Sequence, residues 1–364
     1  MDEVTLAEAL IAIDTSRLDG IETALEYIEG WCSGRDLPVE ELRFGDRRCL
    51  RVSVGEGPLR VMLNGHVDVV PGEPGQFTPQ RRGDRLYGRG AYDMKAAVAA
   101  MMLAVGDLVG ESDPGVQVDL LIVPDEERAA PGANCSELVV ADGYRADFVI
   151  CGEPTDFHVG VHAKGVAIME MRVPGLAAHS STPWLGRNAI LRTVEMMPRI
   201  ETCPFMEGRG TLLGSPSVNL STIVGGDAVN CVPAHCTATL DVRFVPGQSA
   251  DEILQQIRDL DPEVEVEMVI SRPPADLNPD DPFVRSLRDA ALPFSPDSRA
   301  VGRDGSSDAV AFLGAGVPAV EFGPVGAGHH GPEEWVSIES LGLYRRALVE
   351  FVRSLSSSPT VAGA

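Results

Sequence analysis

The stretch Val-Met-Leu-Asn-Gly-His-Val-Asp, residues 61–68, joins a short apolar run to two side chains of metal-binding type, His66 and Asp68. An apolar run of this length is consistent with a buried β-strand. Potential metal ligands directly after such a strand would lie at its carboxyl end. The same arrangement recurs along the chain, and this recurrence predicts the fold.

Three more apolar runs end in potential metal ligands: residues 118–123 before Glu126 and Glu127, 148–151 before Glu153, and 319–322 before a glycine-rich loop that leads to His329 and His330. In an open parallel sheet the carboxyl ends of the strands share one edge, so loops that are distant in sequence converge there. We therefore expect a divalent-metal site made of His, Asp and Glu side chains.

The order of the predicted elements indicates an insertion. Strands and helices alternate in the first part of the chain, which predicts an α/β domain whose mixed sheet has helices on both faces. From residue 165, two helices among four strands predict an α+β unit, and the Pro- and Asp-rich residues 272–282 read as a linker. Because the ligand-bearing run at 319–322 comes later, the last segment must rejoin the first domain. The predicted domains are residues 1–164 with 273–364, and the inserted 165–272.

The composition excludes several classes of protein. The chain has 364 residues, 44% of them hydrophobic, and a net charge of −24. So acidic a chain is not expected to bind nucleic acid or anionic membranes, because phosphate binding depends on clustered Lys and Arg. No apolar run approaches the roughly 20 residues of a membrane-spanning helix, and the amino terminus does not resemble a secretion signal. Seven scattered cysteines suggest reduced thiols, so we expect a cytoplasmic location.

Two pairs of side chains indicate how the expected metal site would work. His66 and Asp68 point to the same side of a strand end, so one could bind metal while the other fixes the ring tautomer. Glu126 and Glu127 would repel each other unless a cation lay nearby. One of them would bind the metal and the other would take a proton from water. Surface acidity is the ordinary explanation for this pair, but its position at a strand end favours function.

Three further candidates also have ordinary explanations. Asp93 opens a helix expected from about residue 94, where the helix dipole favours a carboxylate, and it could be a simple N-cap. Glu153 could be a loop acid. One residue of the pair His329 and His330 should bind metal, and the other could be a loop histidine.

Five segments of the chain resemble the di-zinc amidohydrolase and peptidase family, which contains aminoacylases, acetylornithine deacetylase, succinyl-diaminopimelate desuccinylase and glutamate-releasing carboxypeptidases. In chain order they are residues 65–71, 88–95, 125–127, 152–154 and 330–334. One such motif is weak evidence, but five in order across nearly the whole chain are highly specific. The resemblance implies a zinc-peptidase-like catalytic domain with an inserted lid and dimerisation domain.

The resemblance also implies two zinc ions, with Co²⁺ or Mn²⁺ as substitutes, and five ligands: His66 and Glu153 for one ion, Glu127 and His330 for the other, and Asp93 bridging both. It selects His330 over His329, because the family's ligand lies four residues before the glutamate that matches Glu334. Glu126 would be the general base, and Asp68 would orient His66.

In the inserted domain the resemblance implies that His179 reaches the active site of a neighbouring subunit and stabilises the oxyanion, so a homodimer is expected. Asn230 and Arg243 match positions that contact a substrate carboxylate, for which an arginine fork is suited. Gly305 and Ser306 match a loop that lines the substrate pocket, although Ser-Asp sequences such as 307–308 are also common helix caps.

The predicted function is metal-dependent hydrolysis of the amide bond of an N-acyl amino acid. The first alternative is a di-, tri- or carboxypeptidase with the same centre acting on short peptides. A metal-binding dimer that lost catalysis is the second, and we disfavour it because the base and every ligand position are occupied.

Overall fold

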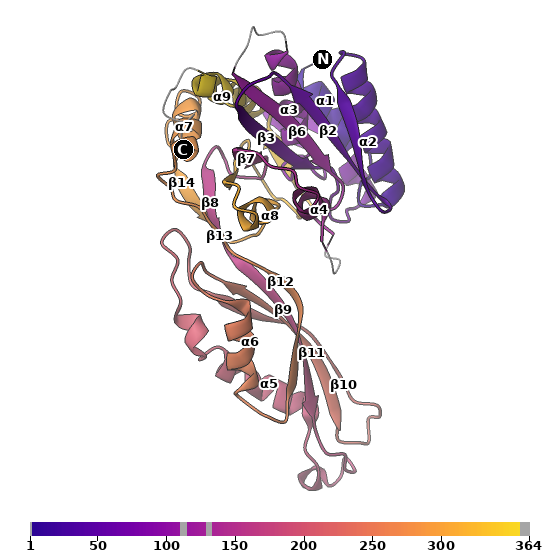
Figure 1. The fold of residues 1–364 in the computed structure, drawn as a ribbon. Coiled ribbons are helices and arrows are strands. Elements are labelled where there is room, and N and C mark those ends of the chain that lie inside the picture. The colour runs from indigo at the N-terminus through magenta and orange to yellow at the C-terminus, as the bar shows by residue number, and fades with distance from the viewer. Residues whose placement is uncertain (1, 110–114, 129–132, 357–364) are drawn as a thin grey trace. The chain divides into compact units, whose positions relative to one another are not determined.

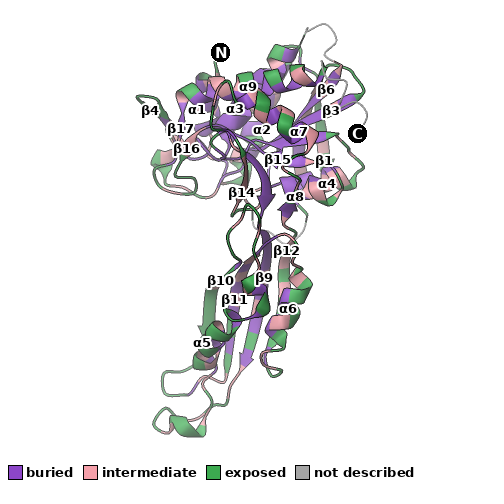
Figure 2. Ribbon diagram, turned by 90° about the vertical axis from the view of Figure 1, so that its left-hand side faces the viewer, coloured by how far each residue is buried: buried purple, intermediate pink, exposed green. Residues whose placement is uncertain are grey.

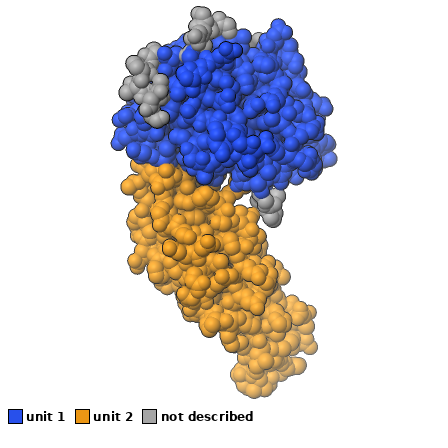
Figure 3. Space-filling model, in the orientation of Figure 1, with its two compact units in different colours: residues 1–161, 277–301, 307–364 blue, residues 162–276, 302–306 orange. Residues whose placement is uncertain are grey.

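The computed structural model describes residues 2–109, 115–128 and 133–356. The chain divides into two compact units, coloured separately in Figure 3. Unit 1 spans residues 1–161, 277–301 and 307–364, and unit 2 spans residues 162–276 and 302–306. Compared with the predicted insertion at 165–272, unit 2 starts three residues earlier, ends four residues later and also contains the short segment 302–306.

The largest sheet of the chain is mixed, and most of its strands belong to unit 1 (Figure 1). Its strands, in spatial order, are β1 (Val39–Phe44), β2 (Arg47–Val54), β6 (Val116–Val123), β3 (Leu59–His66), β7 (Phe148–Cys151), β15 (Ala319–Glu321), β8 (Val159–Ala163) and β13 (Ala275–Asp276), with β14 (Ala300–Arg303) also paired to β8. The central strands β6, β3, β7 and β15 are parallel, whereas β1, β2, β8 and β13 pair antiparallel to their neighbours.

The register of the parallel strands explains why the ligand-bearing loops converge. His66 at the end of β3 pairs with Val123 at the end of β6. Cys151 at the end of β7 pairs with Asn64 of β3 and with Glu321 of β15. The four strands therefore end close to the same level, and the loops that follow them start from one edge of the sheet.

Helices cover both faces of this sheet, so the predicted fold class is confirmed. One face packs against α1 (Glu3–Ile11), α2 (Leu18–Ser33), α3 (Lys95–Leu108), α7 (Pro282–Ala291) and α9 (Ile338–Ser356), and the other packs against α4 (Cys135–Ala141) and α8 (Ala309–Gly314). Alternate residues of β3 serve the two cores: Val61 and Leu63 belong to the first and Met62 to the second.

Helix α3 lies directly behind the site and is buried along nearly its whole length (Figure 2). Its sequence is rich in alanine, which is small enough for the helix to pack against β3 and β6 as well as against α1 and α9. A helix that is apolar all round belongs in a core. The loop before α3, which carries Asp93, is thus attached to a helix that is buried in the core of the unit.

A small antiparallel sheet joins two loops that carry site residues. Its order is β16 (Gly326–Ala327), β17 (Trp335–Ser337), β5 (Arg85–Tyr87) and β4 (Gln80–Arg82), and the 3₁₀ turn η1 (Pro74–Phe77) precedes it. Trp335 pairs with Tyr87. This pairing holds the segment just before Asp93 against the segment just after His330.

Unit 2 is an antiparallel sheet with two helices, in agreement with the α+β unit expected from the sequence. The strand order is β10 (Ser217–Gly225), β11 (His235–Phe244), β9 (Gly165–Pro174) and β12 (Glu265–Arg272). Helices α5 (Ala189–Ile200) and α6 (Ala250–Arg258) pack with the sheet in a core of their own, and η2 (Pro183–Leu185) and η3 (Pro204–Glu207) are short 3₁₀ turns.

The predicted linker at residues 272–282 is not entirely irregular. Ala275 and Asp276 form β13, which pairs with Ala163 and His162 of β8. A two-residue strand between prolines has no periodicity that sequence alone could reveal. Among the described residues, no helix is long and apolar enough to cross a membrane.

Candidate metal centre

His66 lies at the end of β3 and is almost completely buried. Its Nδ1 is 2.9 Å from the backbone oxygen of Asp68. A carbonyl oxygen can only accept, so Nδ1 carries the hydrogen and donates it. Nε2 then points at Asp93, whose Oδ1 is 3.2 Å away. The backbone of the Gly-His-Val-Asp turn thereby selects Nε2 as the atom that can bind a metal ion.

The Asp68 carboxylate forms a loose ion pair with the expected His66, and its hydrogen bonds go to other groups. Its Oδ1 lies 3.6 Å from Nδ1 of His66, farther than the backbone oxygen. Instead, Oδ1 accepts the backbone N–H of Glu126 at 3.1 Å and Oδ2 accepts that of Glu127 at 2.9 Å. Asp68 therefore ties the end of β3 to the end of β6 and fixes the backbone that carries both glutamates.

Asp93 occupies the middle of the cluster. Its Oδ1 faces Nε2 of His66 at 3.2 Å, and its Oδ2 faces Nε2 of His330 at 3.3 Å. The N-cap position of α3 is Met94, so Asp93 does not cap this helix and the ordinary explanation for it does not apply. One carboxylate thus presents one oxygen to each of two histidines.

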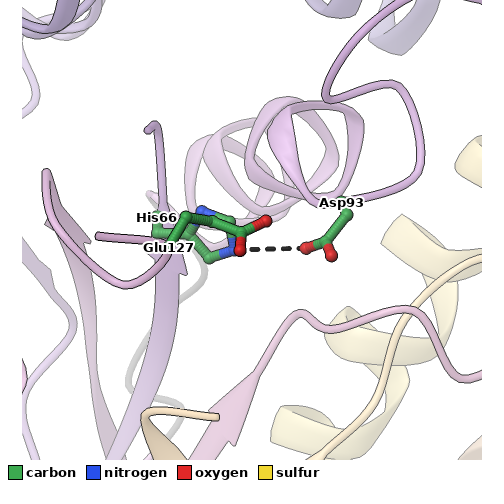
Figure 4. Close-up of side chains that lie close together, drawn as sticks. All are labelled: His66, Asp93 and Glu127. Atoms are coloured by element: carbon green, nitrogen blue, oxygen red, sulfur yellow. Dashed lines mark hydrogen bonds and ion pairs between the residues drawn. The ribbon is translucent and has the colours of Figure 1, made fainter. Parts of the chain in front are cut away.

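The remaining candidate ligands complete two groups around Asp93. Glu127 Oε1 lies 2.7 Å from Nε2 of His330, and Glu153 Oε1 lies 3.9 Å from Nε2 of His66. Figure 4 shows how His66, Asp93 and Glu127 face one another, and one potential ligand atom from each lies within 4.8 Å of the others. The structure therefore brings all five predicted ligands together from five separate segments of the chain.

The adjacent His329 takes a different environment. Its ring packs edge-on against Tyr92, with centroids 5.9 Å apart. His330 has a φ of 61°, in the left-handed region that residues with a side chain seldom adopt. His330 contacts Asp93 and Glu127, whereas the ring of His329 lies between those of Tyr92 and His330 in edge-on contacts.

The electrostatics of the cluster indicate a site made for a cation. Burial raises the pKa of Glu126 well above its ordinary value, and the charges of Asp308, Glu127 and Asp93 raise it further against the opposing effect of His66. Burial also raises the pKa of Glu153, with Asp93 adding to the effect. Crowded, buried carboxylates of this kind are stabilised in their charged form by a nearby positive charge.

The two histidines supply positive charge when no metal is bound. Hydrogen bonds to Asp93 and Glu127 raise the pKa of His330 to about 10. Burial alone would lower the pKa of His66, but its hydrogen bond to Asp93 and the charges of Glu153, Asp68 and Asp93 outweigh burial and raise it. Imidazole nitrogens and carboxylate oxygens are also the donor set that zinc prefers. The residues present therefore fit a divalent-metal centre.

The other predicted site residues belong to unit 2, and each has local contacts there. His179 Nδ1 accepts the backbone N–H of Ser181 at 3.1 Å. Arg243 forms a two-pronged ion pair with Asp241, at 2.7 and 3.0 Å. Asn230 accepts the N–H of Ser180 through its backbone oxygen, at 3.0 Å. Gly305 and Ser306 lie in the segment 302–306 that belongs to this unit.

Sequence reasoning gave no role to several buried polar residues beside the cluster. Asp308 is 1% exposed and accepts hydrogen bonds from Asn134 at 2.5 Å and Ser136 at 2.7 Å, so it does not cap α8 with its side chain. Arg89 and Glu334 form a buried ion pair of 2.7 Å. Asp308 and Glu334 belong to sequence motifs that resemble the family, but short local patterns do not reveal that a residue is buried.

The comparisons with known proteins agree with this geometry. Residues 62–354 match the model of peptidase family M20/M25/M40. A succinyl-diaminopimelate desuccinylase from Sphingopyxis alaskensis is 31% identical, covering 96% of this chain and 98% of that protein. One from Rhizorhabdus wittichii is 30% identical and covers 99% of both chains.

Solved structures show the same fold. An M20 family metallo-carboxypeptidase from Sulfolobus solfataricus has a TM-score of 0.83 at 18% identity, covering 98% of this chain and all of that one. The aminopeptidase PepT from Bacillus cereus has a TM-score of 0.78 at 18% identity and covers 98% of both chains. With the family match extending from the strand that carries His66 to the final helix, the chain belongs to the peptidase family M20/M25/M40 and is a metal-dependent hydrolase.

Proposed function

We propose that this protein hydrolyses the amide bond of an N-acyl amino acid, as a deacylase of the desuccinylase type. The observation that carries the proposal is the Asp93 carboxylate, which presents one oxygen to His66 and the other to His330 next to Glu126. The two relatives named above, which match over nearly their whole length, are called succinyl-diaminopimelate desuccinylases and support the same substrate class. The peptidases among the solved structures are less than 20% identical and therefore support the fold alone.

We assign two Zn²⁺ ions to the centre, with Co²⁺ or Mn²⁺ as substitutes. His66 and Glu153 would hold one ion, Glu127 and His330 would hold the other, and Asp93 would contact both. The two groupings follow the observed proximities of 3.9 Å for His66 with Glu153 and 2.7 Å for Glu127 with His330. Bound divalent ions supply Lewis acidity, which polarises a carbonyl group and makes water acidic near neutral pH.

Glu126 is proposed as the general base. It accepts a proton from the attacking water and returns it to the nitrogen of the leaving amine, so the amide C–N bond breaks as a carboxylate and an amine form. Its raised pKa suits a group that must both accept and donate a proton. Asp68 holds the backbone N–H groups of Glu126 and Glu127 and thereby keeps base and ligand in fixed relative positions.

His179 is proposed to donate a hydrogen bond to the oxyanion of the tetrahedral intermediate, from a partner subunit in a homodimer. The dimer would form through unit 2, where β10 is an edge strand. Exposed edge strands readily pair with another chain. Apolar side chains on β10 and α5 are also exposed, among them Val224 at 70% and Leu191 at 59%. Sedimentation of wild type and Val224→Lys tests the proposed dimer interface. A dimeric wild type with a monomeric variant supports the interface, and an unchanged dimer contradicts it.

Asn230, Arg243, Gly305 and Ser306 are proposed to contact the substrate. The Arg243 fork is already paired with Asp241 in the structure, so a substrate carboxylate would have to share or displace this ion pair. Arg243→Lys, which keeps the charge but loses the fork, should therefore raise KM more than it lowers kcat. A cytoplasmic location is proposed from the seven free cysteines, since disulfides are rare in that compartment.

A substrate panel tests the proposed function. The zinc-loaded protein is assayed by amine release from N-succinyl amino acids, N-acetyl amino acids and dipeptides. The proposal predicts the highest kcat/KM for an N-acyl amino acid, with N-succinyl substrates first. Preferential cleavage of dipeptides would instead establish the peptidase alternative, and zinc binding without hydrolysis of any class would establish the inactive module.

A further inference from the structure

The Glu334 carboxylate is buried beside the metal centre and gathers four donors. Its Oε1 accepts the backbone N–H groups of Tyr92 at 2.9 Å and Asp93 at 3.0 Å. Its Oε2 accepts the backbone N–H of Gly90 at 3.0 Å and Nη1 of Arg89 at 2.7 Å. The residue is only 2% exposed, so water cannot replace these bonds without rearrangement. A single side chain thus accepts hydrogen bonds from three of the backbone N–H groups in the turn that carries Asp93.

These bonds act on the backbone from which the Asp93 side chain extends. Residues 90–93 are turn residues before α3 and have no regular hydrogen-bond ladder of their own. Gly90 has a φ of 80°, and an added Cβ there would lie 2.9 Å from atoms of Lys95 and Val69. The turn is therefore tightly packed on one side and held by Glu334 on the other. Without this acceptor, the three N–H groups would lose a buried hydrogen bond, which is costly.

Arg89 extends the network to two other segments of the centre. The residue is 3% exposed. Its Nη2 donates to the backbone oxygen of His330 at 3.3 Å and lies 3.5 Å from that of Pro71, in the segment that follows His66 and Asp68. The pair formed by Arg89 and Glu334 hence connects the three loops that present His66, Asp93 and His330.

A purely structural explanation accounts poorly for this arrangement. A buried ion pair is a weak source of stability, because removing two charges from water offsets their attraction. Three of the four hydrogen bonds of the Glu334 carboxylate come from backbone N–H groups of residues 90–93, and the fourth comes from Arg89. Its effect is thus concentrated on one ligand-bearing segment.

We propose that Glu334, neutralised by Arg89, is a positioning residue that sets the Asp93 carboxylate between His66 and His330. This inference rests on the proposed function, since it concerns the same metal centre. A residue that orients a ligand in this way typically changes metal affinity by about 10–100-fold when it is replaced. Glu334 would change metal affinity by holding the backbone of Asp93, without contacting the Asp93 side chain.

The test measures Zn²⁺ affinity and stoichiometry by calorimetry in the presence of a competing chelator. Full-length wild type, Glu334→Gln and Glu333→Gln are compared, with circular dichroism of the metal-free proteins as the check of folding. Glu333 is the matched control, because it is the exposed neighbour and loses the same charge. Glutamine at position 334 keeps one acceptor oxygen but turns an NH₂ group toward backbone donors.

The inference predicts zinc affinity ~10–100-fold weaker for folded Glu334→Gln and unchanged for Glu333→Gln. If Glu334→Gln fails to fold because Arg89 is left unpaired, Glu334→Asp keeps the negative charge and is judged by the same criterion. Its shorter side chain cannot reach all four donors. A folded Glu334 variant that binds zinc within twofold of wild type overturns the inference alone. Absence of zinc binding by wild type overturns the proposed function and the inference together.

Discussion

Replacing Asp68 tests how the strand end of β3 organises the centre. Its two carboxylate oxygens accept the backbone N–H groups of Glu126 at 3.1 Å and Glu127 at 2.9 Å. Asparagine retains one acceptor oxygen, but its NH₂ group is a donor and would face the second N–H. Alanine removes both acceptors. The tautomer of His66 should survive either change, because the backbone oxygen of residue 68 holds its Nδ1.

The size of the effect follows from the number of bonds lost. A hydrogen bond to a charged group contributes about 1.5–3 kcal/mol, and about 1.4 kcal/mol corresponds to a factor of ten. Asp68→Asn should therefore lower kcat/KM by roughly 10–100-fold. Asp68→Ala should lower it further, since it leaves two buried N–H groups without a partner. The assay is steady-state hydrolysis at saturating zinc. Asp142→Asn, which makes the same substitution at an exposed residue, is the control.

The competing explanation is that the Asp68 carboxylate acts mainly by its charge on His66, 3.6 Å away. Both substitutions remove that charge, so under this explanation they would lower activity equally. Equal losses in Asp68→Asn and Asp68→Ala would refute the hydrogen-bond reasoning. So would an Asp68→Asn enzyme whose kcat/KM stays within twofold of wild type.

Three further predictions concern the proton transfers and the oxyanion. Glu126→Gln should bind zinc like wild type, measured by calorimetry, while kcat falls by about 10²–10⁴ through loss of the base; unchanged turnover would exclude this role. His330, with its pKa raised to about 10, is protonated at pH 7 in the metal-free protein, and a protonated nitrogen cannot bind metal. Zinc binding at pH 7 should hence release a proton, seen by calorimetry in buffers of different ionisation enthalpy, and apparent affinity should rise as pH increases toward 10. Buffer-independent binding heats would contradict this. His179→Ala should lower kcat by roughly 10²–10³, the typical cost of an oxyanion donor, with zinc affinity unchanged; a loss of zinc affinity instead would place His179 among the ligands.

The convergence of His66, Glu127 and Glu153 could be predicted from sequence because each follows a parallel strand, and such strands end at one edge of the sheet. Each parallel strand is a continuous apolar run, and the residue type after it is visible without a structure. His66 and Glu153 were found this way. The register that places His66 beside Val123 could not be predicted, because a strand that is apolar on both faces has no polar face to specify its alignment.

The contacts that orient these ligands could not be predicted in the same way. His66 is oriented by a backbone oxygen, which every residue possesses and no sequence pattern marks. Glu334 is 2% exposed within a motif rich in charged residues, where surface exposure is the ordinary expectation. Its function depends on pairing with Arg89, 245 positions away in the chain.

Short edge elements escaped prediction for a related reason. Strands β16, β17, β5 and β4 have two or three residues each, too few for a period of two to be recognised. They form because β17 pairs with β5 across a long sequence separation. Likewise, the segment 302–306 belongs to unit 2 through contacts that local sequence does not encode, including the Lys164 to Asp304 ion pair of 2.8 Å.

Anomalous diffraction at the zinc edge, from crystals of the zinc-loaded protein, would show whether Asp93 lies between two bound zinc ions. We expect two adjacent peaks that share the Asp93 carboxylate, one next to His66 and Glu153 and the other next to Glu127 and His330. A single peak, or peaks away from Asp93, would contradict it.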